Sequence, residues 1–200
     1  MHDADAKRCA DALMDRYAAG EDCVFGALYD YVAPKLHSFL LRRTRDPSRA
    51  EDLVQQTLLQ MHCARRHFTP GAEVMPWAFA IARRLMIDGM RRTNREFLAS
   101  NENEEERERA SSIPPETNQG PDAVFASKQL ALRIQAELSR IPEAHRVAFE
   151  LVKQDGLSMA EAAEVLGTTV AAVKIRAHRT YAALRLALGD AIDGGLGGTR

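Results

Sequence analysis

Hydrophobic side chains recur at intervals of three and four residues along most of this chain, which is the spacing of one face of an α-helix. Strict alternation of apolar and polar residues, the mark of a half-buried strand, is negligible. The first helical stretch covers residues 22–43, and Pro34 should kink or locally loosen that helix. The pattern predicts an all-α protein.

The next stretch of helical spacing covers residues 47–66. Its start is well defined, because Asp46 can accept from first-turn amides and a proline at the first helical position sacrifices no hydrogen bond. The positions expected to face inward are Ala50, Leu53, Val54, Thr57, Leu58 and Met61. The positions expected to face outward are Glu51, Asp52, Gln55, Gln56, Leu59 and Gln60. Residues 68–75 should form a loop, and Pro76 should open another helix that reaches about Arg95.

The apolar spacing disappears over residues 96–126, which are acidic and then rich in proline, serine and glycine, a composition typical of flexible linkers. It returns over residues 127–188. We therefore expect two small helical domains, at residues 22–95 and 127–188, joined by a flexible acidic linker. Residues 1–21 would form an N-terminal extension, and residues 189–200 a disordered tail.

The formal net charge of −1 conceals a segregation of charge along the chain. The net charge is +6 over residues 25–95, −6 over residues 96–126 and +3 over residues 127–188. Two positively charged blocks on either side of an acidic connector indicate a polyanionic partner that is contacted at two places.

Residues 145–188 have the pattern of a helix-turn-helix, a motif whose second helix enters the DNA major groove. Ser158 and Glu161 have the spacing of a capping box at the start of one helix. Gly167 lies in the turn, and Thr169 can cap the helix that follows. Because this second helix carries basic but no acidic side chains up to residue 188, the segment predicts DNA binding.

The spacing gives the second helix of this motif an inward and an outward side. The inward stripe is Val170, Val173, Ala177, Tyr181, Leu184 and Leu188. The outward arc is Ala171, Ala172, Ile175, Arg176 and Arg179, with Lys174 and His178 on its shoulder. Arginine can pair with guanine or hold a phosphate. We expect Arg176 to read a base and Arg179 to behave more like a phosphate contact.

A row of charged residues marks the helix that follows Pro76. The members that fall on one stripe of a 3.6-residue period are Trp77, Arg84, Asp88, Arg91 and Arg95. A surface with cations that bind phosphates and an aromatic ring that stacks on unpaired bases suits single-stranded or opening DNA. A solvated charged face with Trp77 in the core is the plainer interpretation of the same spacing.

Other classes of function find no support in the sequence. No apolar run reaches the roughly 18–20 residues needed to span a membrane, and the acidic N-terminus lacks a signal-peptide core. A cytoplasmic protein without direct membrane insertion is expected. Cys9, Cys23 and Cys63 should be free thiols. His62, Cys63 and His67 lack a second ligand pair, and no catalytic motif is evident, so we expect no metal, cofactor or enzymatic activity.

Three blocks of the sequence together resemble the extracytoplasmic-function class of sigma factors, within the sigma-70 family. Residues 49–62 (RAEDLVQQTLLQMH) look like the polymerase-binding helix of sigma region 2. Residues 76–92 (PWAFAIARRLMIDGMRR) look like the helix that melts and reads the −10 promoter element. Residues 138–185 look like the helix-turn-helix of sigma region 4. The resemblance implies a factor that directs core RNA polymerase to promoters.

The resemblance also implies a role for three sets of residues. Core polymerase would dock on Glu51, Asp52, Gln55, Gln56 and Leu59. The −10 DNA would contact Phe68, Gly71, Trp77, Arg84, Asp88, Arg91, Arg92 and Arg95, with the loop over residues 68–75 capturing a flipped base. The −35 DNA would contact Thr168, Thr169, Ala171, Lys174, Ile175, Arg176, His178 and Arg179. The implied partners are promoter DNA, the coiled coil of the largest polymerase subunit, the polymerase flap and an anti-sigma factor.

Two features depart from the family pattern. Ile175 stands where a small polar residue is common, and it can contact a thymine methyl group instead. The loop over residues 68–75 is richer in proline and glycine than acidic or aromatic base-reading loops. The main alternative is a conventional helix-turn-helix regulator, which would bind a palindromic site without polymerase. An RNA-binding or antitermination protein is a further alternative.

Overall fold

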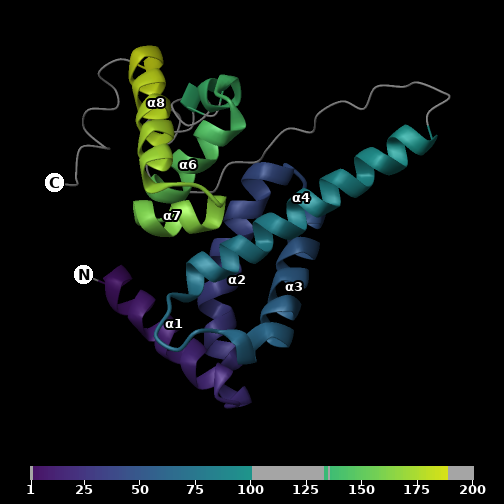
Figure 1. The fold of residues 1–200 in the computed structure, drawn as a ribbon, viewed down its shortest axis with the longest axis vertical. Coiled ribbons are helices and arrows are strands. Elements are labelled where there is room, and N and C mark those ends of the chain that lie inside the picture. The colour runs from purple at the N-terminus through teal and green to yellow at the C-terminus, as the bar shows by residue number, and fades with distance from the viewer. Residues whose placement is uncertain (1, 101–132, 135, 189–200) are drawn as a thin grey trace, which may run out of the picture. The chain divides into compact units, whose positions relative to one another are not determined.

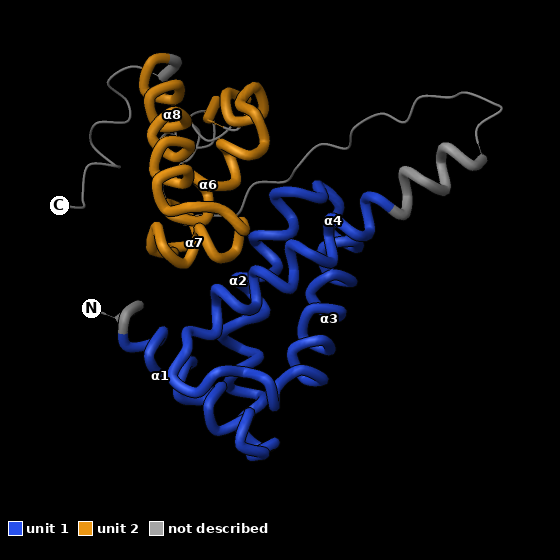
Figure 2. The backbone as a smooth tube through the Cα atoms, viewed as in Figure 1, with its two compact units in different colours: residues 1–111 blue, residues 112–200 orange. Residues whose placement is uncertain are grey.

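The computed structural model describes residues 2–100, 133–134 and 136–188, with side chains described for residues 5–91, 133–134 and 136–186. The chain divides into two compact units, Met1–Ser111 and Ser112–Arg200 (Figure 2). All regular structure in the described residues is helical, which confirms the all-α prediction. The rest of the expected linker after residue 100, the start of the second domain and the expected tail lie outside the described residues.

The described part of unit 1 consists of α-helices and two short 3-10 helices (Figure 1). Their bounds are α1 His2–Ala18, η1 Asp22–Val24, α2 Phe25–Thr44, α3 Pro47–Ala64, η2 Arg65–His67 and α4 Val74–Ser100. Helix α3 begins as expected, because the Asp46 side chain accepts from the Arg49 backbone N–H at 3.2 Å.

The core of unit 1 forms where α2, α3 and α4 pack against one another. Phe39 of α2 and Phe79 of α4 are fully buried, with ring centroids 4.8 Å apart. Every α3 position predicted to face inward is buried, which confirms the helical period used for that segment. Burying a large apolar side chain contributes about 1.5–3 kcal/mol. This packing therefore fixes which face of α3 points outward.

The first 21 residues are more than an extension, because α1 is a helix that packs on the rest of unit 1. Ala10, Met14 and Tyr17 lie on one face of α1 and are each 3 % exposed or less. Their spacing of four and three residues is that of a core-facing stripe. Helix α1 is thus part of the core of unit 1, which the sequence analysis did not anticipate.

Helix α4 begins earlier and ends later than expected. It begins at Val74, two residues before Pro76. Pro76 lacks an N–H and fits within a first helical turn. The Val74 N–H donates to Asp11 Oδ1 of α1 at 2.8 Å. Helix α4 then continues to Ser100, so the first residues of the expected linker are helical. Helix α2 likewise continues through Pro34 to Thr44.

The junction between α2 and α3 contains a strained residue. Arg45 has φ 55° and ψ 22°, a left-handed conformation that disfavours side chains with a Cβ atom. Its N–H donates to the Leu41 carbonyl at 3.0 Å and closes the C-terminus of α2. Glycine is the residue that takes this position without strain.

We expect Arg45→Gly to stabilise unit 1 by about 0.5–1 kcal/mol, because it relieves that strain. Urea unfolding followed by Trp77 fluorescence measures this, since Trp77 is the single tryptophan and lies in unit 1. Ser38→Gly is the matched control. Ser38 is an exposed residue in the middle of α2, where glycine should cost about 1 kcal/mol. Equal destabilisation by both changes would contradict the strain at Arg45.

Unit 2 contains α6 Glu143–Lys153, α7 Met159–Leu166 and α8 Val170–Leu188, preceded by helical residues at 133–134 and 136–140. Its core includes a cluster of Leu138, Phe149, Ala177 and Leu184, against which Ile134, Ile141 and Tyr181 pack. Helix α8 packs on both α6 and α7. One side of α8 is therefore committed to the core, and the opposite side points to solvent.

Candidate functional site

The ends of α7 and the start of α8 have the capping geometry predicted for a helix-turn-helix. Ser158 Oγ accepts from the Glu161 N–H at 3.2 Å, and Glu161 Oε2 accepts from the Ser158 N–H at 2.6 Å. Gly167 has φ 61° and ends α7 in the left-handed conformation. Thr169 Oγ1 accepts from the Ala172 N–H at 3.2 Å and caps α8. The capping box fixes the start of α7, and Gly167 and Thr169 shape the turn from which α8 begins.

The buried side of α8 differs from the predicted stripe at two positions. Val173, Ala177 and Leu184 are buried as expected, whereas Val170 is 48 % exposed. Thr180 is fully buried instead, and its hydroxyl donates to the Arg176 carbonyl at 3.1 Å. That bond satisfies the hydroxyl inside the core. The prediction for Val170 is wrong, because this first-turn residue lies at the edge of the buried stripe. The side chain of Leu188 lies outside the described residues.

The outward side of α8 is a mixed apolar and basic surface. Its exposed members are Thr169, Ala171, Lys174, Ile175, His178 and Arg179. Thr168, Ala172 and Arg176 are half-buried at its margins. Within the described residues, none of Lys174, Arg176 and Arg179 forms an ion pair with an acidic side chain. These cations can therefore meet an anionic partner without first breaking an ion pair in the chain.

The outward face of α3 carries the five residues expected to dock on a protein partner. The exposed members are Glu51, Asp52, Gln55, Gln56 and Leu59, and we call this set the α3 face. Leu59 is 61 % exposed and adds apolar area to this polar face. A polar surface around one exposed leucine has the character of a reversible protein interface.

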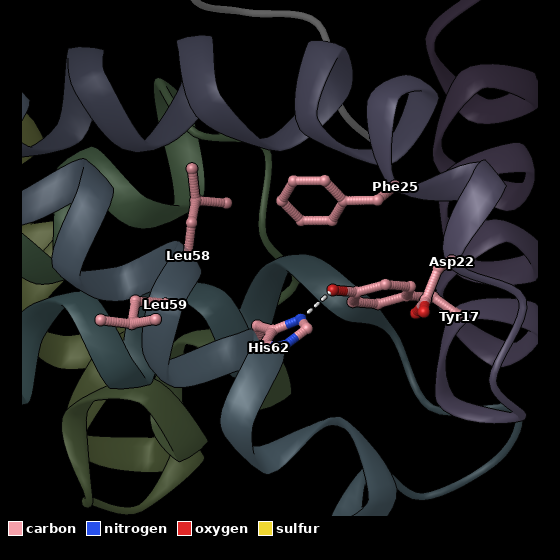
Figure 3. Close-up of a pocket in the computed structure, with 6 residues that line it drawn as sticks. All are labelled: Tyr17, Asp22, Phe25, Leu58, Leu59 and His62. Carbon is pink, nitrogen blue, oxygen red and sulfur yellow. Dashed lines mark hydrogen bonds between the residues drawn. The ribbon is translucent and has the colours of Figure 1, made fainter.

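An apolar pocket lies at the C-terminal end of the α3 face (Figure 3). It has a volume of about 380 Å³ and is lined by Tyr17, Asp22, Phe25, Leu58, Leu59 and His62. Leu58 and Leu59 come from α3, Phe25 from α2, Asp22 from η1 and Tyr17 from α1 (Figure 3). The sequence analysis missed this pocket, because it depends on α1 packing beside α3.

A polar network closes one side of this pocket. The Tyr17 hydroxyl and His62 Nδ1 are hydrogen-bonded (Figure 3). The Arg65 guanidinium lies 5.1 Å from the Tyr17 ring centroid, and its Nη2 is 3.2 Å from Asp22 Oδ1. Burial raises the pKa of the Tyr17 hydroxyl above its ordinary value, and the Arg65 guanidinium offsets part of this rise. The network ties α1, η1 and α3 together around the pocket.

Helix α4 exposes only part of the predicted −10 surface. Arg84, Asp88 and Arg91 are exposed, and Arg84 Nη2 donates to Gln60 Oε1 of α3 at 2.8 Å. Trp77 is half-buried, and its ring centroid lies 5.1 Å from that of Phe68. The charged members of the predicted stripe are therefore exposed, but Trp77 does not offer an open aromatic surface for base stacking. The side chains of Arg92 and Arg95 lie outside the described residues.

The loop over residues 68–73 is held in place by one buried side chain and by a hydrogen bond to α1. Phe68 is 5 % exposed, so its side chain supports the loop and does not present a surface. Gly71 is exposed with φ +77°, a conformation that glycine takes without strain. The Gly71 N–H donates to Asp15 Oδ1 of α1 at 3.0 Å. Aspartates of α1 thus contact the residues that lead into α4.

Other types of site are not evident in the described residues. They contain no group of three or more His, Cys, Asp and Glu side chains that could hold a metal ion. None of their helices combines the length and apolar character needed to cross a bilayer. Cys9, Cys23 and Cys63 are exposed free thiols.

Comparisons with known proteins connect both units to one family. The family model of sigma-70 region 2 matches residues 28–96, and that of sigma-70 region 4 matches residues 131–184. The RNA polymerase sigma factor CarQ of Myxococcus xanthus is 30 % identical over 177 residues, which cover 88 % of this chain and 96 % of CarQ. The ECF RNA polymerase sigma factor SigL of Mycobacterium tuberculosis is 35 % identical over 176 residues, which cover 86 % and 92 % of the two chains.

Solved structures include similar folds. The sigma factor RpoE of Bartonella quintana, solved in complex with the anti-sigma factor NepR, has a TM-score of 0.67 and 25 % identity, covering 82 % of this chain and 96 % of RpoE. CnrH, solved with the cytosolic domain of CnrY, has a TM-score of 0.57 and 23 % identity, covering 90 % of this chain and 96 % of CnrH.

Proposed function

Because the chain belongs to the extracytoplasmic-function class of sigma-70 factors and is an alternative sigma factor, we propose how its surfaces divide the work of initiation. Unit 1 docks on core RNA polymerase through the α3 face and opens the −10 element with α4 and the loop over residues 68–73. Unit 2 reads the −35 element with the outward side of α8. The observation that carries this proposal is that unit 1 exposes the polar α3 face and the arginines of α4, and unit 2 exposes the basic outward side of α8, each beside a packed core.

Reconstitution tests the whole proposal. The purified chain, core polymerase and a DNA fragment from upstream of its own coding region should give a discrete run-off transcript that core polymerase alone does not give. Tight binding of the chain alone to a palindromic site, with no transcript, would instead support a conventional helix-turn-helix regulator.

Docking on the α3 face is supported by its polarity and by the neighbouring pocket. Polar side chains around a central apolar residue suit an interface that must form and dissociate. The pocket next to Leu59 gives an apolar side chain of the polymerase coiled coil a place to bury surface. The polymerase flap is the further contact that we propose for unit 2.

An anti-sigma factor is the inhibitory partner that we propose. One similar protein, RpoE, was solved bound to an anti-sigma factor. The α3 face and its pocket combine an exposed leucine with an apolar recess, and an inhibitor that covered them would block polymerase docking. The two partners would then compete for one surface.

Recognition of the −35 element is supported by α8, but burial changes the roles expected of its arginines. Arg179 is exposed on the outward side, whereas Arg176 is half-buried at its margin. A side chain at the margin reaches the groove wall and its phosphates more readily than the base edges. We therefore assign base reading to Arg179 and phosphate contact to Arg176, the reverse of the expectation from sequence.

We expect Arg179→Ala to lower discrimination at one −35 position by about 1–3 kcal/mol. Arg176→Ala should weaken binding to all −35 sequences alike, and it should make the slope of log affinity against log salt less steep by about 0.9. Competition binding of holoenzyme to −35 variants at two salt concentrations measures both effects. Arg185→Ala is the control, because Arg185 is exposed on α8 outside the proposed surface. Unchanged affinity and unchanged preference in both Arg176→Ala and Arg179→Ala would remove α8 from the DNA interface.

A further inference from the structure

Helix α1 lies outside the region matched by the sigma-70 region 2 model, which begins at residue 28. Three of its side chains nonetheless contact the segment that leads into α4. Asp15 Oδ1 accepts from the Gly71 N–H at 3.0 Å, and Asp11 Oδ1 accepts from the Val74 N–H at 2.8 Å. Lys7 Nζ lies 2.9 Å from Glu73 Oε2. The three residues are spaced by four, so they form one stripe along α1.

These contacts reach the segment at points where a loop would otherwise be held weakly. Gly71 has a left-handed backbone with open space around it. Val74 is the first residue of α4, and N–H groups of a first helical turn have no partner within their own helix. A carboxylate also interacts favourably with the positive end of the helix dipole. Asp11 therefore caps α4 from another helix, and Asp15 fixes the loop just before it.

We propose that α1 is a positioning element that sets the conformation of the loop over residues 68–73 and so determines −10 base preference. The inference rests on the proposed role of this loop in −10 capture. Asp15 and Asp11 do not touch DNA in this proposal. They reduce the number of conformations that the loop samples, and a base-binding loop that is already ordered loses less entropy when it binds.

The side chains of α1 that contact the loop are different from those that pack α1 into the core of unit 1. Ala10, Met14 and Tyr17 hold α1 against the unit, whereas Asp11 and Asp15 are only half-buried. Removing the Asp15 carboxylate should therefore free the loop without displacing α1. Asp15→Ala is the main variant for this reason, and Asp15→Asn keeps an acceptor oxygen at the same place. Asp5→Ala is the matched control. This substitution removes the same charge from α1, but Asp5 pairs with Arg8 of the same helix and not with the loop.

The experiment is run-off transcription by reconstituted holoenzyme from a promoter library randomised across both the −10 and −35 elements. The wild-type chain defines the preferred bases. Asp15→Ala should lower the ratio of best to worst base at one −10 position about tenfold, which corresponds to about 1.4 kcal/mol. The −35 preference and the affinity for core polymerase should be unchanged. Asp15→Asn should restore most of the −10 preference, and Asp5→Ala should behave as wild type.

The outcomes separate the inference from the proposed function. If wild-type holoenzyme selects no promoter, the proposed function fails. If it selects a promoter and Asp15→Ala keeps the wild-type −10 preference, α1 does not position the loop. Equal losses in Asp15→Ala and Asp5→Ala would trace the effect to charge alone and also overturn the inference. Trp77 fluorescence of each variant during thermal unfolding shows whether unit 1 is folded in the assay.

Discussion

Replacing Asp52 by lysine and Gln55 by arginine should lower the affinity of this sigma factor for core polymerase about a hundredfold, or about 2.7 kcal/mol. Both side chains are exposed on the α3 face, one turn apart. Two long cations there would meet a partner surface that is complementary to a carboxylate and an amide, and like charges or unpaired charges at an interface are costly. Pull-down of core polymerase, followed by titration of the labelled chain, measures the loss.

The loss must come from the interface and not from unfolding. Substitutions of exposed residues away from special features change stability by about 0.5 kcal/mol or less, so the unfolding midpoint of unit 1 should be preserved. The control is Asp30→Lys with Ser38→Arg, which makes the same charge change at exposed positions of α2. If the α3 variant binds core polymerase as tightly as this control, polymerase docks elsewhere.

The α3 face could be predicted from sequence because local periodicity decides it. Six inward positions repeat at three- and four-residue spacing, and the packing of α2, α3 and α4 buries all of them. The cap at Asp46 and the capping box at Ser158 were predictable for the same reason, since each uses residues within one helical turn. Where a structure is determined by neighbours in sequence, a pattern in the sequence is sufficient.

The contacts of α1 could not be predicted in that way. Its contacts join Asp15 to Gly71 and Asp11 to Val74, across 56 and 63 residues of chain. No local signal pairs these residues, because the spacing of Lys7, Asp11 and Asp15 by four defines one face of a helix but not what that face contacts. The contact between Phe68 and Trp77 is also a tertiary contact. The sequence predicts an accessible Phe68 ring in a loop, but the structure buries it.

The proposed exchange of roles between Arg176 and Arg179 has a more local cause. A stripe of apolar residues predicts the buried side of α8 only to within the angle of one residue. Thr180 joins that side because its hydroxyl finds an acceptor in the Arg176 carbonyl. Arg176 lies four residues before the buried Thr180, on the same side of the helix, and is half-buried at the margin. Hydropathy alone does not register this hydrogen bond.

Replacing both Arg84 and Arg91 by alanine should slow strand opening at the −10 element about a hundredfold and leave the initial binding of holoenzyme to duplex DNA almost unchanged. The two exposed arginines are seven residues apart, so they lie on one face of α4. Gln60 holds the Arg84 guanidinium through a neutral amide, which orients the cation without cancelling its charge. A hundredfold change in rate corresponds to about 2.7 kcal/mol, and a hydrogen bond to a charged group contributes about 1.5–3 kcal/mol, so one fully lost contact or two partly lost contacts account for the expected effect.

Permanganate reactivity of unpaired thymines measures opening, and the difference between duplex and premelted templates decides what the arginines do. If α4 helps to separate the strands, a premelted −10 element should restore most of the lost rate. Arg8→Ala with Arg16→Ala removes the same charge from exposed positions of α1 and should open duplex DNA normally. Normal opening by the α4 variant would show that Arg84 and Arg91 only form a solvent-exposed charged face and take no part in strand opening. An equal loss on both templates would assign them to holding the single strand, because then the contact is needed even when no base pairs have to be broken.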